Sequence, residues 1–159
     1  MGLKTYADAV LANVNAVFAA AAPPVVLPTL QYVAPGPYSS ISFDCDQLVV
    51  SIDQLTRGRP GEPQSSYTRL PLEWSATVTV SIIRLCMPTS GTTAPPLAIH
   101  QAAASEITMR DLDLLWRNVK AILDVEGCTH HGVVLASLIE IQGAAGGARL
   151  VSTVDLLMV

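Results

Sequence analysis

The longest regular pattern in the chain is an alternation of apolar and polar residues that runs from Glu73 to Met87. A period of two places successive side chains on opposite faces of a β-strand. The two faces are Trp74, Ala76, Val78, Val80 and Ile82 on one side, and Ser75, Thr77, Thr79 and Ser81 on the other. A strand with one apolar face needs a second layer packed against it. The alternation slips at Ile82–Ile83, so we expect a bulge or burial on both faces there, before Pro88 ends the strand.

Four other segments have the pattern of strands. Gln47–Leu55 is apolar on both faces, which predicts a central strand. Val133–Gln142 and Arg149–Val159 predict a hairpin around the Gly-Ala-Ala-Gly-Gly segment at 143–147. A short edge strand is expected at Gln31–Val33, within a proline-rich region.

Helical spacing predicts an N-terminal amphipathic helix that ends before Pro23 and Pro24. Its apolar stripe is Val10, Val14, Val17 and Phe18. Polar residues interrupt the apolar region that a secretory signal would need, so a helix of the mature fold is preferred over a signal peptide. The interrupting residues are Asp8, Asn13 and Asn15.

A long helix is predicted from Leu97 to Val125, weakened near Ser105–Thr108 and capped by Gly127. Its apolar stripe is Leu112, Leu115, Trp116, Val119, Ile122 and Leu123. Its solvated face is Glu106, Arg110, Asp113, Arg117, Lys120 and Asp124. We therefore expect the apolar stripe, including Trp116, to face the sheet.

The order of these elements predicts an α+β fold with a largely antiparallel or mixed sheet. The N-terminal helix and the one long helix are expected on one face of that sheet. Residues 1–159 form a single domain, because no linker separates two core-sized halves. Residues 22–40 contain five prolines and are expected to form an extended connector.

The chain is 50% apolar and only 14% charged, yet no stretch is expected to cross a membrane. Ordinary domains carry about 25% charged residues. As a monomer, this chain would therefore have few charged side chains to place on its surface. The apolar excess predicts burial between protein surfaces, as in a subunit of an assembly. A net charge of −4 argues against specific nucleic-acid binding.

No catalytic motif is present: the sequence lacks a GxSxG elbow, a phosphate-binding loop with its lysine, HExxH and GxGxxG. The glycines at 143–147 lack the lysine and helix that phosphate binding needs, which favours a turn. Paired carboxylates at Asp44/Asp46 and Asp111/Asp113 are attributed to turns and a wet helix face. We therefore expect no catalytic residues, no cofactor and no enzyme activity.

Cys128, His130 and His131 form the one cluster of metal-ligand residue types. Zinc needs three or four converging ligands, whereas adjacent histidines on a strand point to opposite faces, so no metal site is predicted. Cys128 and the two other cysteines, Cys45 and Cys86, are widely spaced and odd in number, which predicts reduced structural thiols.

The segment from Arg57 to Leu70 is the candidate interaction loop. Its glycines and prolines keep it exposed between two predicted strands. Its charged residues are a large share of a charge-poor chain: Arg57, Arg59, Glu62 and Arg69. A simple connector without a partner is the alternative for this loop.

Three segments carry a resemblance to a known family: residues 44–50, residues 74–80 continuing into 84–88, and the long helix with Asp113 and Trp116. In this order they resemble the tail terminator proteins of long-tailed, siphovirus-type phages, especially those that infect actinobacteria. The resemblance covers about Tyr32 to Asp124, and its motifs are strand signatures rather than chemical ones. The alanine- and proline-rich N-terminal region and the sparse charge depart from the family pattern.

The resemblance implies a virion structural protein that forms a ring, a homohexamer, on the last ring of the tail tube. Such a ring ends tube polymerisation and provides the docking surface for head completion proteins. The implied partners are other copies of the chain, the major tail tube protein and a head completion or stopper protein, with DNA passing through the lumen without specific binding. The implied location is the tail–neck junction of the virion, after assembly in the host cytoplasm.

Two alternatives remain open at this point. One is a head–tail connector or stopper subunit of the virion neck, which would also be small, oligomeric and without catalytic motifs. The other is a small zinc- or thiol-dependent enzyme that uses Cys128, His130 and His131.

Overall fold

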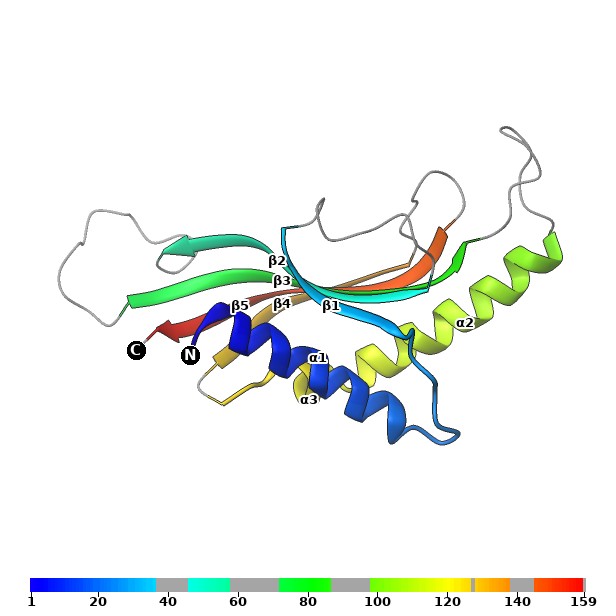
Figure 1. Cartoon of the computed structure of the whole chain (residues 1–159), viewed down its shortest axis with the longest axis horizontal. Helices are drawn as coiled ribbons and strands as arrows, with labels where there is room; N and C mark the ends of the chain where they lie inside the picture. Colours follow the sequence, from blue (N-terminus) through cyan, green and yellow to red (C-terminus); the bar gives the residue numbers. More distant parts are fainter. Residues whose placement is uncertain (37–45, 58–71, 87–97, 127, 138–144, 159) are drawn as a thin grey trace.

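The computed structural model describes residues 1–36, 46–57, 72–86, 98–126, 128–137 and 145–158. They form one five-stranded sheet with the helices packed beside it (Figure 1). The elements are α1 (Leu3–Ala19), β1 (Leu30–Pro35), β2 (Gln47–Arg57), β3 (Leu72–Cys86), α2 (Ala98–Arg117), α3 (Val119–Leu123), β4 (Cys128–Ser137) and β5 (Ala145–Met158).

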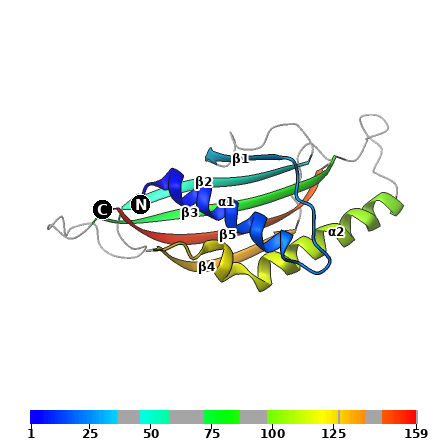
Figure 2. The ribbon, with the colours of Figure 1, turned by 60° about the horizontal axis from the view of Figure 1, so that its bottom comes forward.

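The five strands make one mixed sheet in the order β1-β2-β3-β5-β4. β1 runs parallel to β2, and the other neighbours pair antiparallel. α1 packs against β1 and β2, and α2 packs against β5 and β4, on the same face of the sheet (Figure 2). The predicted α+β class, the mixed sheet and the N-terminal helix are therefore confirmed.

β3 is the centre of the sheet and has the two faces that its alternation predicted. Ala76, Val78, Val80 and Ile82 are buried beneath the helices. Both outcomes predicted for the slip in alternation at Ile82–Ile83 are observed. Ile82 and Ile83 are both buried, and the β3–β5 register shifts between Ile83 and Leu85. The bulge accommodates one extra residue, and the strand continues to Cys86.

The prediction of a single long helix over residues 97–125 is wrong in two respects. α2 ends at Arg117, and the short α3 follows after Asn118, whose backbone has φ −119° and ψ 18°. The Asn118 side chain donates to the carbonyl of Leu114, and asparagine disfavours the helix interior because it competes for such backbone groups. By contrast, α2 is continuous through Ser105–Thr108, where a weakness was predicted. The expected cap, Gly127, lies outside the described residues.

The hairpin prediction is confirmed in its pairing and wrong in its limits. β4 and β5 pair antiparallel, but β4 begins at Cys128 rather than at Val133. Gly143 and Ala144 lie outside the described residues, whereas residues 145–147 belong to β5 and pair with β3 instead of forming a turn. A Cβ at Gly147 would lie 2.2 Å from the carbonyl oxygen of Ile82, so glycine is needed there for close approach of the two backbones.

Polar side chains of α1 fix the short α3. Tyr6 Oη donates to the carbonyl of Leu123 at 3.0 Å, and Asn13 Nδ2 donates to the carbonyl of Ile122 at 3.1 Å. The last carbonyls of a helix have no partners within it, so these side chains satisfy buried acceptors. The predicted α1 stripe is buried at Val10, Val14 and Phe18, with Val17 packed partly against the core.

β1 forms an edge of the sheet within the predicted connector, which confirms the edge strand expected near Gln31–Val33. Asn15 of α1 and Gln31 of β1 join their side-chain amides by two hydrogen bonds, of 2.7 and 3.1 Å. Residues 37–40 of the connector lie outside the described part. None of the described helices is both long enough and apolar enough to span a membrane.

A buried ion pair at one end of the sheet joins β3 to α2 and to the connector between α1 and β1. Arg84, near the end of β3, donates through Nε to Asp111 of α2 and through Nη1 to the carbonyl of Val26 at 2.6 Å. The Asp111 side chain is only 1% exposed and that of Arg84 13% exposed. This one guanidinium therefore holds α2 and the connector against the sheet.

We expect Asp111→Asn to lower the free energy of unfolding by about 3 kcal/mol, because removing one partner of a buried pair leaves the other charge uncompensated. Asp113→Asn is the matched control on the same helix, since Asp113 pairs with Arg117 in solvent. The control should cost less than about 0.5 kcal/mol. Urea unfolding followed by circular dichroism measures both, and equal losses would contradict the role given to Arg84.

Candidate interaction surfaces

The structure describes only one member of the predicted interaction loop. Arg57 is the last residue of β2, where its backbone pairs with Trp74 of β3. Arg59, Glu62 and Arg69 lie outside the described residues. The interaction role of this loop therefore stays a prediction.

The two adjacent histidines of β4 point to opposite faces of the sheet, as their alternation predicted. His130 Nδ1 bonds Asp124, which follows α3 on the helical side. His131 Nε2 lies 2.7 Å from Asp155 Oδ2 on the other face. Within the part of the chain that is described, no three histidine, cysteine or acidic side chains are grouped to hold a metal ion.

Of the three cysteines, only Cys128 has a described side chain. It is a free thiol, partly buried at the start of β4. Burial raises the pKa of the Cys128 thiol, and the N-terminal amino group offsets this in part. Cys45 lies outside the described residues, and Cys86 is the last residue of β3. A raised pKa keeps Cys128 protonated at neutral pH, whereas nucleophilic cysteines have lowered pKa values.

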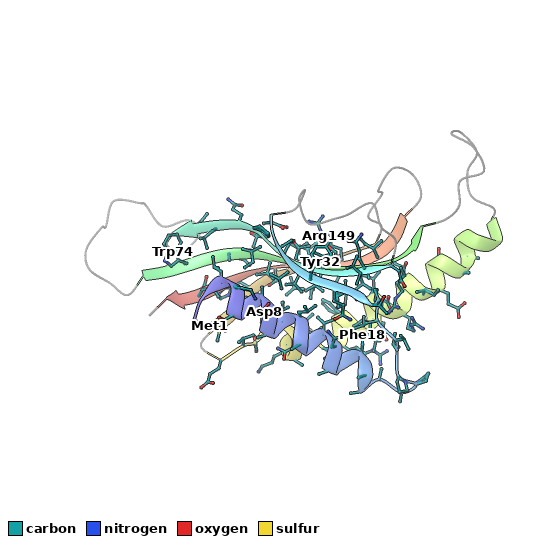
Figure 3. The ribbon with its side chains drawn as sticks, viewed as in Figure 1. Met1, Asp8, Phe18, Tyr32, Trp74 and Arg149 are labelled. Atoms are coloured by element: carbon teal, nitrogen blue, oxygen red, sulfur yellow. The ribbon has the colours of Figure 1, made fainter. Side chains whose placement is uncertain are left out.

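Among the described side chains, two carboxylates lie on the face of the sheet opposite the helices, and each is held by polar neighbours. Asp53, the extra residue at the β2 bulge, accepts from Ser51 Oγ at 2.7 Å and from Thr79 Oγ1 at 2.5 Å. Arg149 Nη2 lies 3.7 Å from the same carboxylate, on the face away from α1 (Figure 3).

Asp155 is held in the same way as Asp53 on this face. It accepts from Ser75 Oγ at 2.7 Å and bonds His131. Both carboxylates therefore form hydrogen bonds with two polar side chains of the sheet. This arrangement orders the polar side chains of the sheet and is attributed to structure rather than to acid–base chemistry.

The outer face of α2 exposes two large apolar side chains, and this was missed from the sequence. Trp116 is 62% exposed and Met109 is 64% exposed. The predicted apolar stripe placed Trp116 in the core, but only Leu115, Ile122 and Leu123 of that stripe are fully buried. Met109 and Trp116 are seven residues apart, so they lie on one side of the helix.

Charged side chains lie beside these two residues, and we call the whole set, together with Lys120 of α3, the α2 outer face. It consists of Met109, Arg110, Asp113, Trp116, Arg117 and Lys120, all of them exposed. Aromatic residues, methionine and arginine are the types enriched at protein–protein interfaces. The composition of the α2 outer face is thus that of a protein contact.

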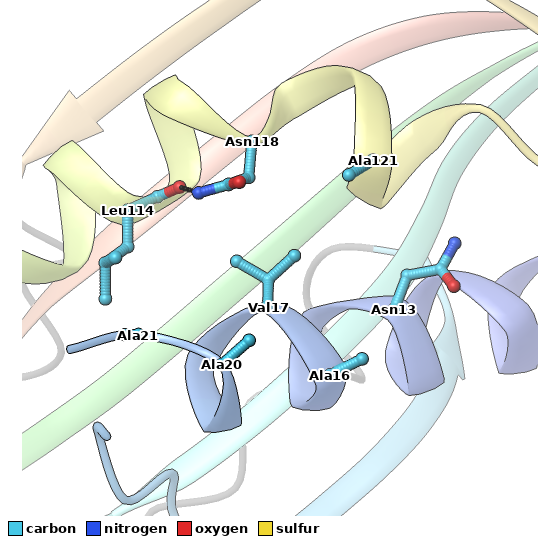
Figure 4. Close-up of a pocket in the computed structure, with 8 residues that line it drawn as sticks. All are labelled: Asn13, Ala16, Val17, Ala20, Ala21, Leu114, Asn118 and Ala121. Carbon is cyan, nitrogen blue, oxygen red and sulfur yellow. Dashed lines mark hydrogen bonds between the residues drawn. The ribbon is translucent and has the colours of Figure 1, made fainter. Parts of the chain in front are cut away.

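An open groove of about 350 Å³ lies between α1 and the α2–α3 segment (Figure 4). Four alanines and two larger apolar residues form most of its lining, with an asparagine at either side. The lining residues are Asn13, Ala16, Val17, Ala20, Ala21, Leu114, Asn118 and Ala121. The alanine side chains are too small to fill the space between α1 and the α2–α3 segment, so the groove stays open to the outside.

Comparison with models of known protein families gives no match for this chain, and comparison with curated proteins gives none either.

We expect alkylation of Cys128 to show a higher midpoint pH in the folded protein than in concentrated urea, because burial raises the thiol pKa in the fold. Rates are read by mass spectrometry of the peptide that contains Cys128, with the urea-unfolded chain as control. A midpoint lower in the folded protein would indicate an activated thiol and would favour the thiol-dependent enzyme.

Proposed function

We propose that this chain is a virion structural protein that forms a ring on the end of a phage tail tube. The ring ends tube polymerisation and gives head completion proteins a docking surface. The observation that carries the proposal is the α2 outer face, where Trp116 and Met109 stand in solvent on a regular helix. Tryptophan and arginine are among the residue types enriched in binding hot spots, and Arg117 follows Trp116 in the chain.

The composition of the chain supports the same proposal. Half of the residues are apolar and 14% are charged, whereas a chain that worked as a monomer would need more polar cover. Closed rings use head-to-tail contacts between two different surfaces of each subunit. The chain offers two unlike surfaces, the α2 outer face and the α1/α2–α3 groove.

The more specific parts of the proposal come from the resemblance. These are the hexamer, the major tail tube protein and the head completion or stopper protein as partners, and the tail–neck junction as the location. A net charge of −4 suits a conduit through which DNA passes without binding, because like charges keep phosphates from adhering.

A head–tail connector or stopper subunit of the virion neck is the alternative within the same class. Both kinds of subunit need exposed apolar contacts, so the α2 outer face supports either. The two differ in the partner that each binds first. A terminator binds the growing tube, whereas a connector binds the head.

We expect the purified protein to co-sediment with tubes assembled from the tail tube protein of the same phage and to shorten them as its molar ratio rises. Added subunits would cap tube ends and compete with elongation. Tube lengths are measured in negative-stain images, with Trp116→Ala as the comparison variant. If the protein stays in the supernatant and tube length does not change, the terminator proposal is wrong. Binding of the protein to isolated heads would then favour the connector.

We expect shortening of residues 58–70 to a tight turn to leave folding almost unchanged but to reduce tail completion or head joining. Loop closure depends weakly on length, about 0.6 kcal/mol for each twofold change. The length-preserving control replaces Arg59, Glu62 and Arg69 with serine, which separates charge from length. Phage with the deletion that give normal titres and normal tails would show that this segment is only a connector.

A further inference from the structure

The first half of α2 projects from the body of the molecule. Figures 1 and 2 show the first turns of α2 extending past the ends of the strands. Among the described side chains of α2, none before Asp111 is buried, and Ala102, Ser105 and Glu106 are exposed. Helical segments shorter than about 12–15 residues are marginal in water, and most helices are stabilised by packing of one face. The projecting half of α2 therefore lacks a packing partner within its own chain.

An exposed row of side chains runs along the whole of α2. Ala102, Met109 and Trp116 recur every seven residues, and each is exposed. Residues at this spacing drift by only about 20° around the axis, so they form one row. Asp111 follows Met109 by two residues and lies about 200° around the axis from it, on the buried side. A row with this spacing is the pattern by which one helix packs along another.

Charges of alternating sign flank this row. In chain order they are Glu106, Arg110, Asp113 and Arg117, spaced by four, three and four residues. Reversing the direction of the helix turns the order of signs into its complement. In a two-fold antiparallel pair the same flank of each helix faces its counterpart. An antiparallel second copy would therefore bring Arg117 opposite Glu106 and Arg110 opposite Asp113.

The bonds that these charges already form leave them able to bind a second copy. Arg117 Nε donates to Asp113 Oδ1 at 2.8 Å, yet the two side chains remain 71% and 52% exposed. Arg110 Nη2 lies 3.4 Å from Asp111 and its side chain is 48% exposed. A guanidinium carries five donors and a carboxylate has two oxygens, so each can take a further partner.

The apolar row fits the same register as the charges. With Arg117 opposite Glu106, the two-fold axis passes beside residues 111 and 112, and Trp116 lies beside Ser105 and Met109 of the second copy. Small Ser105 leaves room for the indole, and a methionine sulfur beside an aromatic ring is a favourable contact. The half of α2 that is anchored on the sheet would thus cover the projecting half of the other copy.

We propose that two copies of this chain pair through α2 as an antiparallel, two-fold dimer. The row Ala102, Met109 and Trp116 forms the apolar seam, and the alternating charges form its flank. Both copies use the same surface, whereas a ring needs head-to-tail contacts between different surfaces. The inference therefore goes beyond the proposed function and does not depend on it. The dimer is the state of the free chain, and it has to separate before the α2 outer face can take part in a ring.

A charge exchange on the full chain tests the register. Glu106→Lys with Asp113→Lys makes the flank entirely basic, and Arg110→Glu with Arg117→Glu makes it entirely acidic. Like charges then face each other in either homodimer, but opposite charges face each other in the mixed pair. We expect each double variant to dimerise at least about tenfold more weakly than the wild type in sedimentation, and an equimolar mixture to recover dimerisation. A mixture that stays monomeric would overturn the inference.

A second pair of variants tests the apolar seam with all charges intact. Trp116→Ser removes its largest side chain, and Val134→Ser is the control on β4, because Val134 is 59% exposed and Trp116 62% exposed. We expect Trp116→Ser to weaken dimerisation at least about tenfold and Val134→Ser to leave it unchanged. Equal dimerisation of the two variants would contradict the seam.

The outcomes separate this inference from the proposed function. A wild-type chain that sediments as a monomer but caps tail tubes would overturn the α2 dimer and leave the terminator function standing. A dimer that obeys the charge exchange but neither binds nor shortens tubes would support the α2 contact and count against the terminator function.

Discussion

The ion pair between Arg84 and the buried Asp111 is the polar interaction that ties α2 to the central strand of the sheet. Arg84 leaves the end of β3 and satisfies Asp111 of α2 and the carbonyl of Val26 together. An arginine can serve two acceptors because its donors form a rigid fork. Arg84 therefore ties α2 to the central strand, while Leu115 packs α2 into the core over β5 and β4.

One wall of the groove is formed by α1, whose polar residues act at long range in sequence. Tyr6 and Asn13 bond the last carbonyls of α3, and Asn15 bonds Gln31 of β1. These contacts fix α1 between the edge of the sheet and the end of the α2–α3 segment. The groove exists because α1 and α2 are both held firmly while the residues between them are alanines.

Much of the fold could be predicted from the sequence because its strands obey a simple period. β3 and the β4–β5 pair followed from alternation, although the polar residues Ser75, Thr79 and Ser81 are buried as well as the apolar face. Three features could not be found in this way. The break at Asn118 depends on a local side-chain bond, and the exposure of Trp116 depends on where α2 meets the sheet. The need for glycine at position 147 depends on the distance to Ile82 of another strand.

The bond between Tyr6 and Leu123 also bears on how the chain folds during synthesis. Its two partners are 117 residues apart, so α1 leaves the ribosome long before its partner exists. At about 5–20 residues per second, the delay is roughly 6–23 s. Through this interval the apolar side of α1, with Val10, Val14 and Phe18, lacks α3 as a packing surface. The nascent chain thus carries an exposed apolar helix that a chaperone could bind until residue 123 emerges.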